Sequence, residues 1–348
     1  MRKHYGNSTM SGKYLEKLNK ELLDAGKDEA FIARCLDYAK RLVDEGLPVI
    51  FDVKHLALLL GIDYGPFITL TIHGTHRYKT IRIKKKRGGH RTIRVPSTSL
   101  KYIQRWILDN IISQMYCSEA ATGFVPGTSI KKNAERHLNC TCLLNIDIKD
   151  FFPSITYEDV FRIFRYYGYT YKLASCLANI CTEDDELPQG APTSPMLANI
   201  RCIKLDRRIK LLCEKYKANY SRYADDITIS GNGGIANIIE AVTEIITDEG
   251  FEINEKKTRI LFPHQRQEIT GLIINNGIIR VPREFKKELK KEIYYCKKYG
   301  PTDHQKHIGD THSFYKEHLY GKAYYVNMIE PDVGNVLLDE LDAIDWEN

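Results

Sequence analysis

The sequence lacks the cysteine spacings that build zinc sites or disulfide frameworks. It contains nine cysteines, an odd number, and no two of them form a Cys-x-x-Cys pair. This pattern argues against both a zinc framework and a set of structural disulfides. Most of the cysteines stand among apolar residues, so we expect them to be small hydrophobic side chains of the core.

Long apolar stretches and simple repeats are missing as well. No run approaches the roughly 20 apolar residues of a membrane-spanning helix, and the polar start MRKHYGNSTMSGKYLEK has no apolar signal segment. Internal repeats, low-complexity tracts and proline-rich linkers are absent. The 348 residues, 43% hydrophobic and 28% charged, predict a cytoplasmic globular protein with a core large enough for two or three subdomains.

Acidic residues are missing from one segment that is rich in lysine and arginine. From Arg77 to Arg105 the chain carries eleven basic residues and no acidic one, although its formal net charge is only +6. Apolar side chains alternate on either side of Gly88 and Gly89, at Tyr78, Ile81, Ile83, Ile93 and Val95. The alternation favours a β-hairpin with a basic face over a solvated tail. A folded basic ribbon favours nucleic acid or a nucleoside triphosphate as partner.

The order of the expected elements indicates an α+β fold. Apolar residues at spacings of three and four predict helices over 11–61, 99–117, 157–181, 196–215 and 234–249, and a mostly helical segment after about residue 282. Strands are predicted over 68–95, 141–149, 219–223 and 226–230, with short strands over 250–280. This irregular mixture fits a palm-like sheet better than a parallel doubly wound one.

Aspartates stand at the ends of two apolar strand sequences. Asp147 follows a buried strand, and Asp225 and Asp226 lie at the tip of a predicted hairpin. A buried carboxylate needs a partner or a bound cation, although a helix cap near Asp150 or a simple turn aspartate is the plainer alternative. Neighbouring strand residues point to opposite faces, so we expect Asp225 to be the main ligand and Asp226 a supporting one. Such carboxylates suit two magnesium ions.

A second aspartate pair shows how little adjacency proves. Asp184 and Asp185 lie in the charged run Thr182–Glu186, with no strand-forming residues around them. We interpret this pair as part of a solvated loop. The pair at Asp225 differs because strand-forming residues enclose it on both sides.

Several segments together resemble the motifs of reverse transcriptases. Tyr223-Ala224-Asp225-Asp226 resembles the family's Y-x-D-D motif, and Asp147 with Phe151-Phe152 resembles its first acidic motif. The other matching segments, in the order that the family has them, are RTIRVP at 91–96, LPQGAPTSP at 187–195 and NEKKT at 254–258. The resemblance implies a right-hand polymerase with fingers, palm and thumb that copies RNA into DNA.

Two further signatures resemble those of bacterial retron reverse transcriptases. Asn133 to His137 matches N-A-x-x-H, and Ile269-Thr270-Gly271 resembles V-T-G with isoleucine in place of valine. The resemblance implies an N-terminal helical extension over 1–67, fingers over 68–140, a palm over 141–281 and a thumb over 282–348. It also implies that the enzyme copies a cognate structured noncoding RNA into RNA-linked single-stranded DNA. Anti-phage defence beside a separate effector protein is the implied setting.

The resemblance also assigns roles to individual residues. It implies a catalytic metal site for two Mg²⁺ ions, or Mn²⁺, at Asp147, Ile148, Asp225 and Asp226. Contacts with the incoming dNTP are expected from Lys84, Arg91, Asp150, Phe151, Phe152, Gln189, Gly190 and Lys257. Contacts with RNA are expected from Asn133, His137, Thr270 and Gly271. Phe152 would exclude the ribose 2′-hydroxyl, unless it simply packs in the core. Lys257 would donate a proton to pyrophosphate or, alternatively, cap a strand.

Other functions stay open at this point. A group II intron enzyme has a longer maturase region, whereas this chain ends soon after the expected start of the thumb at Pro282. An untemplated or protein-primed defence polymerase is a second alternative. A third is a scaffold that chiefly holds RNA–DNA and an effector.

Overall fold

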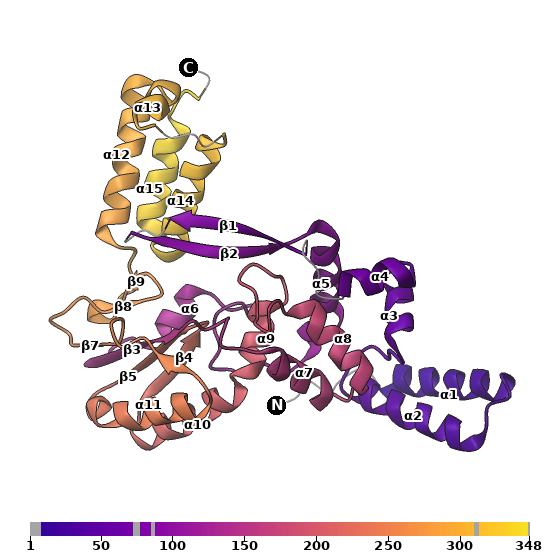
Figure 1. Ribbon diagram of the computed structural model, residues 1–348. Helices are drawn as coiled ribbons and strands as arrows, with labels where there is room; N and C mark the ends of the chain where they lie inside the picture. The colour runs from indigo at the N-terminus through magenta and orange to yellow at the C-terminus, as the bar shows by residue number, and fades with distance from the viewer. Residues whose placement is uncertain (1–7, 72–76, 85–87, 310–312, 347–348) are drawn as a thin grey trace. The chain divides into compact units, whose positions relative to one another are not determined.

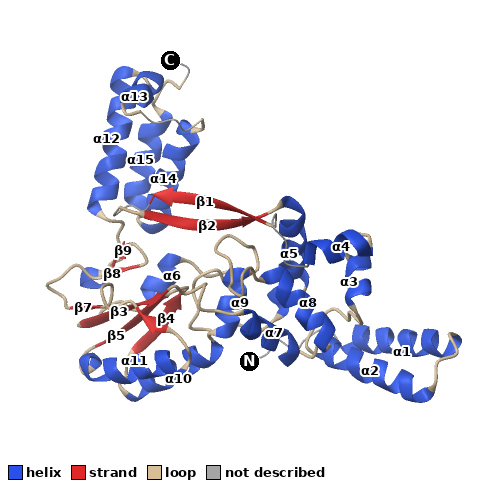
Figure 2. Cartoon of the chain, in the orientation of Figure 1, coloured by secondary structure: helices blue, strands red, loops and turns tan. Residues whose placement is uncertain are grey.

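A computed structural model describes residues 8–71, 77–84, 88–309 and 313–346. The expected α+β class is confirmed, because the described residues form helices together with a five-stranded sheet and two separate two-stranded hairpins (Figure 2). The chain divides into two compact units. Unit 1 comprises Met1–Val125, Ile148–Arg208 and Ile245–Glu252, and unit 2 comprises Pro126–Asp147, Ile209–Glu244 and Ile253–Asn348. The division into extension, fingers, palm and thumb stays a prediction.

Unit 1 is mainly helical (Figure 1). Its helices are α1 (Ser8–Asp24), α2 (Glu29–Asp44), α3 (Val53–Leu59), α4 (Tyr64–Thr71), α5 (Thr98–Asn110), α7 (Tyr157–Tyr166), α8 (Tyr171–Cys181) and α9 (Ser194–Arg201), with the short η1 (Ile112–Gln114). Side chains that accept from free backbone N–H groups start several of them, as Asp28 does for α2 and Thr156 for α7. α10 (Ile203–Lys215) and α11 (Ile239–Asp248) each contribute to both units.

Two expectations for unit 1 are wrong. The predicted helix over 157–181 is broken into α7 and α8, since Gly168 between them has a φ of +101° that no helix continues. The strand expected from residue 68 begins only at Tyr78, because α4 extends to Thr71. Within the described ranges no single helix has the length and apolar character of a membrane span, although α3 and α4, which meet at a bend of 108°, reach them when taken together.

The basic segment of unit 1 folds as the expected β-hairpin. β1 (Tyr78–Lys84) pairs antiparallel with β2 (His90–Pro96) from end to end. Residues 85–87, which include three of the basic residues, lie outside the described part of the chain. At the base of the hairpin Arg77 Nη2 donates to the carbonyl of Asn179 at 2.6 Å. The hairpin is therefore anchored to the end of α8.

The five-stranded sheet is built largely from unit 2. Its strands are β3 (Cys142–Lys149), β4 (Asn219–Tyr223), β5 (Asp226–Gly231), β6 (Glu252–Ile253) and β7 (Arg259–Leu261). They are ordered β4-β5-β3-β6, and β7 also pairs with β3. The apolar sequence of β3 is explained by burial, since six of its eight residues, Asp147 among them, are buried.

The C-terminal part of unit 2 is a helical bundle. It contains α12 (Arg283–Tyr299), α13 (Pro301–His307), α14 (Tyr315–Ile329) and α15 (Pro331–Asp342). A small hairpin, β8 (Glu268–Ile269) and β9 (Leu272–Ile273), shares one apolar core with the bundle and with α6 (Ile130–Glu135). Short 3-10 turns, η2 (Ile235–Ile238) and η3 (Asn275–Gly277), complete the unit.

Candidate active site

The expected catalytic aspartates meet at one end of three adjacent strands. β5 pairs with β4 on one side and with β3 on the other (Figure 1). The register places Asp226 directly opposite Asp147 on β3 and opposite Tyr223 on β4. Directly opposite residues share a face of the sheet. Asp226 therefore lies beside Asp147 on one face of the sheet, and Asp225 lies in the turn between β4 and β5. Which of the two is the main metal ligand stays a prediction.

The turn that carries Asp225 is strained and supported from the interior. Ala224 has a φ of +55°, a left-handed conformation that costs a non-glycine residue about 1–2 kcal/mol. Arg222 is fully buried, and its Nη1 donates to the carbonyl of Ala224 at 3.1 Å. Strained backbone persists where the surroundings hold it. Sequence reasoning missed Arg222, although a charged residue flanked by strand-forming tyrosines just before the aspartate pair was a usable signal.

Lys257 completes the cluster from the turn between β6 and β7. Its Nζ lies 2.8 Å and 3.0 Å from the two carboxylate oxygens of Asp147. The backbone N–H of Asn254, in the same turn, donates to the carbonyl of Asp147 at 2.8 Å. Asp147 thus holds this turn with both its backbone and its side chain. Lys257 pairs with a carboxylate instead of capping a strand, and proton donation by Lys257 stays a prediction.

The carboxylates impose a negative potential on one another. Loss of hydration, followed by the charges of Asp225 and Asp147, raises the pKa of Asp226 to about 6, while Lys257 offsets part of the effect. Like charges held this close disfavour ionisation unless a cation joins them.

The chemistry of this donor set fits hard divalent cations. Three aspartates supply only carboxylate oxygens, the ligands that Mg²⁺ and Mn²⁺ prefer. Across the described ranges no group of three or more His, Cys, Asp or Glu side chains is arranged in a closed metal-binding geometry. The ammonium of Lys257 forms an ion pair with the carboxylate of Asp147. Ile148 follows within β3 with a buried aliphatic side chain, so it brings no side-chain ligand.

The residues that follow β3 belong to unit 1 and divide into exposed and buried. Asp150 is exposed in a left-handed turn with a φ of +46°. Phe151 is buried against Phe251, with ring centroids 5.9 Å apart, and meets the edge of Phe152 at 5.4 Å. The core-packing alternative thus explains Phe151. Phe152 is only partly buried, and its role as a steric gate stays a prediction.

The loop containing Gln189 and Gly190 is bound to β2. The backbone N–H of Arg94 donates to the carbonyl of Gln189 at 2.9 Å. A Cβ on Gly190 would lie 2.7 Å from the carbonyl oxygen of Arg94 and 2.9 Å from Cγ2 of Ile93, and φ is +117°. Glycine is needed here because the β2 backbone passes so close. Proximity of this loop to a nucleotide remains a prediction.

The two basic residues chosen for the triphosphate lie on opposite strands of the β1–β2 hairpin. Arg91 is exposed on β2 and pairs with Ile83. Lys84 ends β1 opposite His90, and its side chain lies outside the described part of the structure. The pattern of an exposed basic ribbon is thus confirmed for the described residues, and triphosphate binding stays a prediction.

The residues expected to touch RNA have different surroundings. Asn133 and His137 are 1% and 0% exposed, so neither side chain is presented to an RNA, and direct contact is not supported. Thr270 and Gly271 form the two-residue turn between β8 and β9, with φ of +46° and +83°. Gly271 is exposed, and an RNA contact at this turn stays a prediction.

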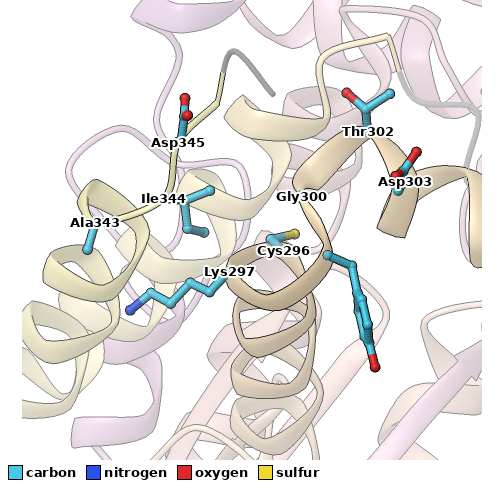
Figure 3. A pocket seen from close by; sticks show the side chains of 9 residues that line it. Cys296, Lys297, Gly300, Thr302, Asp303, Ala343, Ile344 and Asp345 are labelled. Atoms are coloured by element: carbon cyan, nitrogen blue, oxygen red, sulfur yellow. The ribbon is translucent and has the colours of Figure 1, made fainter.

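A separate hollow of about 750 Å³ lies in the C-terminal bundle (Figure 3). Residues at the end of α12, at the start of α13 and after α15 line it, among them Lys297, Asp303 and Asp345. The lining contains no residue expected from the sequence and carries charges of both signs. The carboxylate cluster on the sheet, rather than this hollow, is therefore the candidate active site.

Known proteins match this chain over more than half of its length. A family model described as reverse transcriptase (RNA-dependent DNA polymerase) matches residues 83–276, which include every site residue expected from the sequence. The Retron Ec86 reverse transcriptase of Escherichia coli is 37% identical over 271 residues, covering 76% of this chain and 84% of that protein. The Retron Mx65 reverse transcriptase of Myxococcus xanthus is 32% identical over 342 residues, covering 91% and 75%. Among solved structures, a telomerase from Candida albicans with a fragment of telomeric RNA has a TM-score of 0.46 and 12% identity, covering 78% of this chain and 64% of that one.

Proposed function

This chain belongs to the reverse transcriptases and, within them, to the retron reverse transcriptases, and we propose that it copies part of a cognate structured RNA into single-stranded DNA that stays joined to that RNA. It is an RNA-directed DNA polymerase with a right-hand fold. The observation that carries the proposal is the register that sets Asp147 opposite Asp226, with Asp225 in the adjoining turn. The first nucleotide would be joined to a 2′-hydroxyl of the RNA.

We assign two Mg²⁺ ions to the carboxylates of Asp147, Asp225 and Asp226. When bound, such ions activate the attacking hydroxyl and stabilise the leaving pyrophosphate. The protein supplies the arrangement around them. Arg222 holds the turn at Ala224, so the carboxylate of Asp225 is placed before any ion arrives.

Lys257 and Phe152 have proposed roles beside the carboxylates. Lys257 balances the charge of Asp147, and a lysine held next to the reacting phosphates can donate a proton to pyrophosphate. Phe152 lies against the buried ring of Phe151, and this support would keep it firm as a gate against the ribose 2′-hydroxyl. The exposed basic ribbon around Arg91 would neutralise the triphosphate and the template backbone.

The partners follow from the same proposal. A cognate noncoding RNA would serve as both template and primer, and a separate effector protein would act with the RNA–DNA product in defence against phages. Membership among the retron enzymes supports the RNA partner. The effector rests on the family resemblance alone.

The proposal is tested by isolating nucleic acid from cells that express the gene with its native flanking DNA. We expect single-stranded DNA whose gel mobility changes after RNase treatment, because RNA is covalently attached. Asp226→Asn should abolish this DNA, whereas Asp185→Asn, in the exposed pair, should not. DNA that never carries RNA, or that is made without an RNA template, would contradict the proposal.

A further inference from the structure

A buried histidine connects β4 and β5, the two strands of the hairpin whose turn carries Asp225. His137 follows α6 and is fully buried. Its Nε2 lies 2.7 Å from Oγ of Ser221 on β4, and its Nδ1 lies 2.7 Å from Oγ of Ser230 on β5. Ser221 Oγ in turn lies 2.6 Å from Oδ1 of Asn133 in α6. We call these four residues the hairpin clamp.

The hydrogen bonds of the hairpin clamp run in one direction. Oδ1 of Asn133 only accepts, so the hydroxyl of Ser221 donates its single proton there. Ser221 Oγ then accepts from the Nε2–H of His137. A neutral imidazole has one N–H, so Nδ1 accepts from the hydroxyl of Ser230. Burial, with a smaller effect from Arg136, lowers the pKa of His137 to about 3, which keeps the ring neutral near pH 7.

The hairpin clamp contacts the face of the sheet that carries the carboxylates. Side chains alternate along a strand, so Asp226, Thr228 and Ser230 share one face of β5. Ser221 is paired with Thr228, and Asp147 is paired with Asp226. Both partners therefore lie on that same face. The clamp is at one end of this face, and the carboxylates are at the other.

The hairpin clamp also spans two different rungs of the hairpin. Within the described residues β4 is an edge strand that pairs with β5 alone. Ser221 faces Thr228, whereas Ser230 faces Asn219. A shift of β4 along β5 would change the distance between the two serine hydroxyls and break the imidazole bridge. The same shift would change the connection that carries Asp225, since register and turn geometry depend on each other.

We propose that His137 is a positioning residue of the polymerase, which fixes the register of β4 on β5 through Ser221 and Ser230 and so holds the connecting turn that carries Asp225. The role is exerted through the hairpin, at a distance from any substrate. It differs from RNA binding because the donor and acceptor groups of the ring are used inside the protein.

The test measures metal binding and turnover in full-length variants. His137→Phe keeps an aromatic ring, although a larger one, and removes both hydrogen bonds. Ser230→Ala removes the bond to β5, and His137→Gln restores a donor near the Nε2 position. Mn²⁺ binding is titrated by electron paramagnetic resonance without nucleotide, and kcat and KM for dTTP are measured on poly(rA)/oligo(dT). For His137→Phe we expect Mn²⁺ binding and kcat each to fall about tenfold, with an unchanged KM, as befits lost hydrogen bonds that position a site. The Mn²⁺ affinity and kcat of His137→Gln and Ser230→Ala should lie between those of wild type and those of His137→Phe.

A second buried histidine provides the matched control. His304 in α13 is 6% exposed and stacks on Tyr295 at 5.4 Å, so His304→Phe makes the same exchange outside the hairpin clamp. We expect it to leave Mn²⁺ affinity and kcat unchanged. Wild-type Mn²⁺ affinity and kcat in folded His137→Phe and Ser230→Ala would overturn the proposal. So would weakened binding of poly(rA)/oligo(dT) with unchanged Mn²⁺ affinity, which would assign His137 to nucleic acid. If His137→Phe does not fold, Ser221→Ala and Ser230→Ala decide by the same measurements.

Discussion

Two aspartate pairs in this chain look alike in sequence and lie at similar turns, yet only one is part of a site. Asp184 and Asp185 have φ of +51° and +65° and form the tip of a small exposed hairpin. Ala224, with a φ of +55°, shares the other turn with Asp225. The exposed pair is balanced at the surface, where Asp184 Oδ2 lies 2.8 Å from Nη1 of Arg94. The interpretation of that pair as a surface loop is confirmed.

The two pairs differ in what lies behind each turn. A buried arginine, Arg222, holds the carbonyl of Ala224 in the turn that carries Asp225. His137 connects β4 and β5 on the face of the sheet that carries the carboxylates. The cross-strand neighbour of Asp226 is another carboxylate, Asp147. A carboxyl pair becomes a metal-binding candidate when the protein holds like charges together, not when it merely has two acids in sequence.

The largest difference between the two pairs should appear in polymerase activity when single carboxylates are neutralised. Asp226→Asn or Asp147→Asn removes a carboxylate that we assign to the metal ions, and polymerase activity should fall at least about a thousandfold, since such ions stabilise the transition state by several kcal/mol. Asp185→Asn should change activity less than about twofold. Primer extension on an RNA template measures both. Comparable losses in the two pairs would remove the distinction between them.

The pH dependence of the free energy of unfolding should distinguish the turn at Asp225, which has His137 nearby, from the exposed turn at Asp185. The pKa of His137 is lowered from 6.5 in the unfolded chain to about 3 in the folded protein. Between these values the unfolded chain binds one more proton, so stability present above pH 6.5 is lost as pH falls toward 3. We expect wild type to lose about 1.4 kcal/mol per pH unit more than His137→Gln between pH 6 and pH 4.

Urea unfolding at pH 7, 6, 5 and 4 measures this difference. Asp185→Asn should follow the wild-type slope, because the exposed pair has no buried histidine behind it. Equal slopes for wild type and His137→Gln would mean that the ring is not kept neutral by the fold.

The sequence was sufficient to predict that Asp147 and the pair Asp225-Asp226 lie together in one candidate site, but not how they are held. The order of the motifs placed Asp147 and the aspartate pair in one site because each ends a strand-forming run. It could not give the register, since pairing of β3 with β5 is a contact between distant parts of the chain and a one-residue slip exchanges the faces. For that reason the sequence could not show that Asp226 lies opposite Asp147, and the ranking of Asp225 above Asp226 as a metal ligand stays a prediction.

Buried polar residues were the other limit of sequence reasoning. Ser221, Arg222 and Ser230 are polar residues within predicted strands, and polar side chains that become buried there indicate an internal network or a site. Whether such residues form an internal network or a site depends on their partners, which come from α6 and from the turn at Ala224. Local sequence spacing does not show that these distant segments meet. Asn133 and His137 were accordingly taken for RNA contacts, whereas the structure buries them against the hairpin.

A third, smaller effect concerns Mn²⁺ affinity and the cation beside each pair, Lys257 in one case and Arg94 in the other. Lys257 occupies both carboxylate oxygens of Asp147, so Lys257→Met should free them and tighten Mn²⁺ binding about threefold to tenfold, from Coulomb energy in a half-exposed site. Turnover should fall at the same time if the lysine also serves the pyrophosphate. Asp184→Asn, which breaks the ion pair with Arg94, should leave Mn²⁺ affinity unchanged. Weaker Mn²⁺ binding by Lys257→Met would show that the ammonium helps the metal site instead of competing with the ion.

The smallest effect concerns the strain of the turns themselves. Glycine adopts a positive φ without cost, so Ala224→Gly and Asp185→Gly should each stabilise the protein, by about 0.5–1 kcal/mol at most. The gain should be larger at Ala224, because aspartate tolerates the left-handed region better than alanine does. Only Ala224→Gly should also lower turnover, by a few fold, since the added freedom loosens the position of Asp225. Thermal unfolding and primer extension measure the two properties separately. If Ala224→Gly raised stability without lowering turnover, Arg222 and His137 would suffice to place the carboxylates, and the strained alanine would contribute nothing to the site.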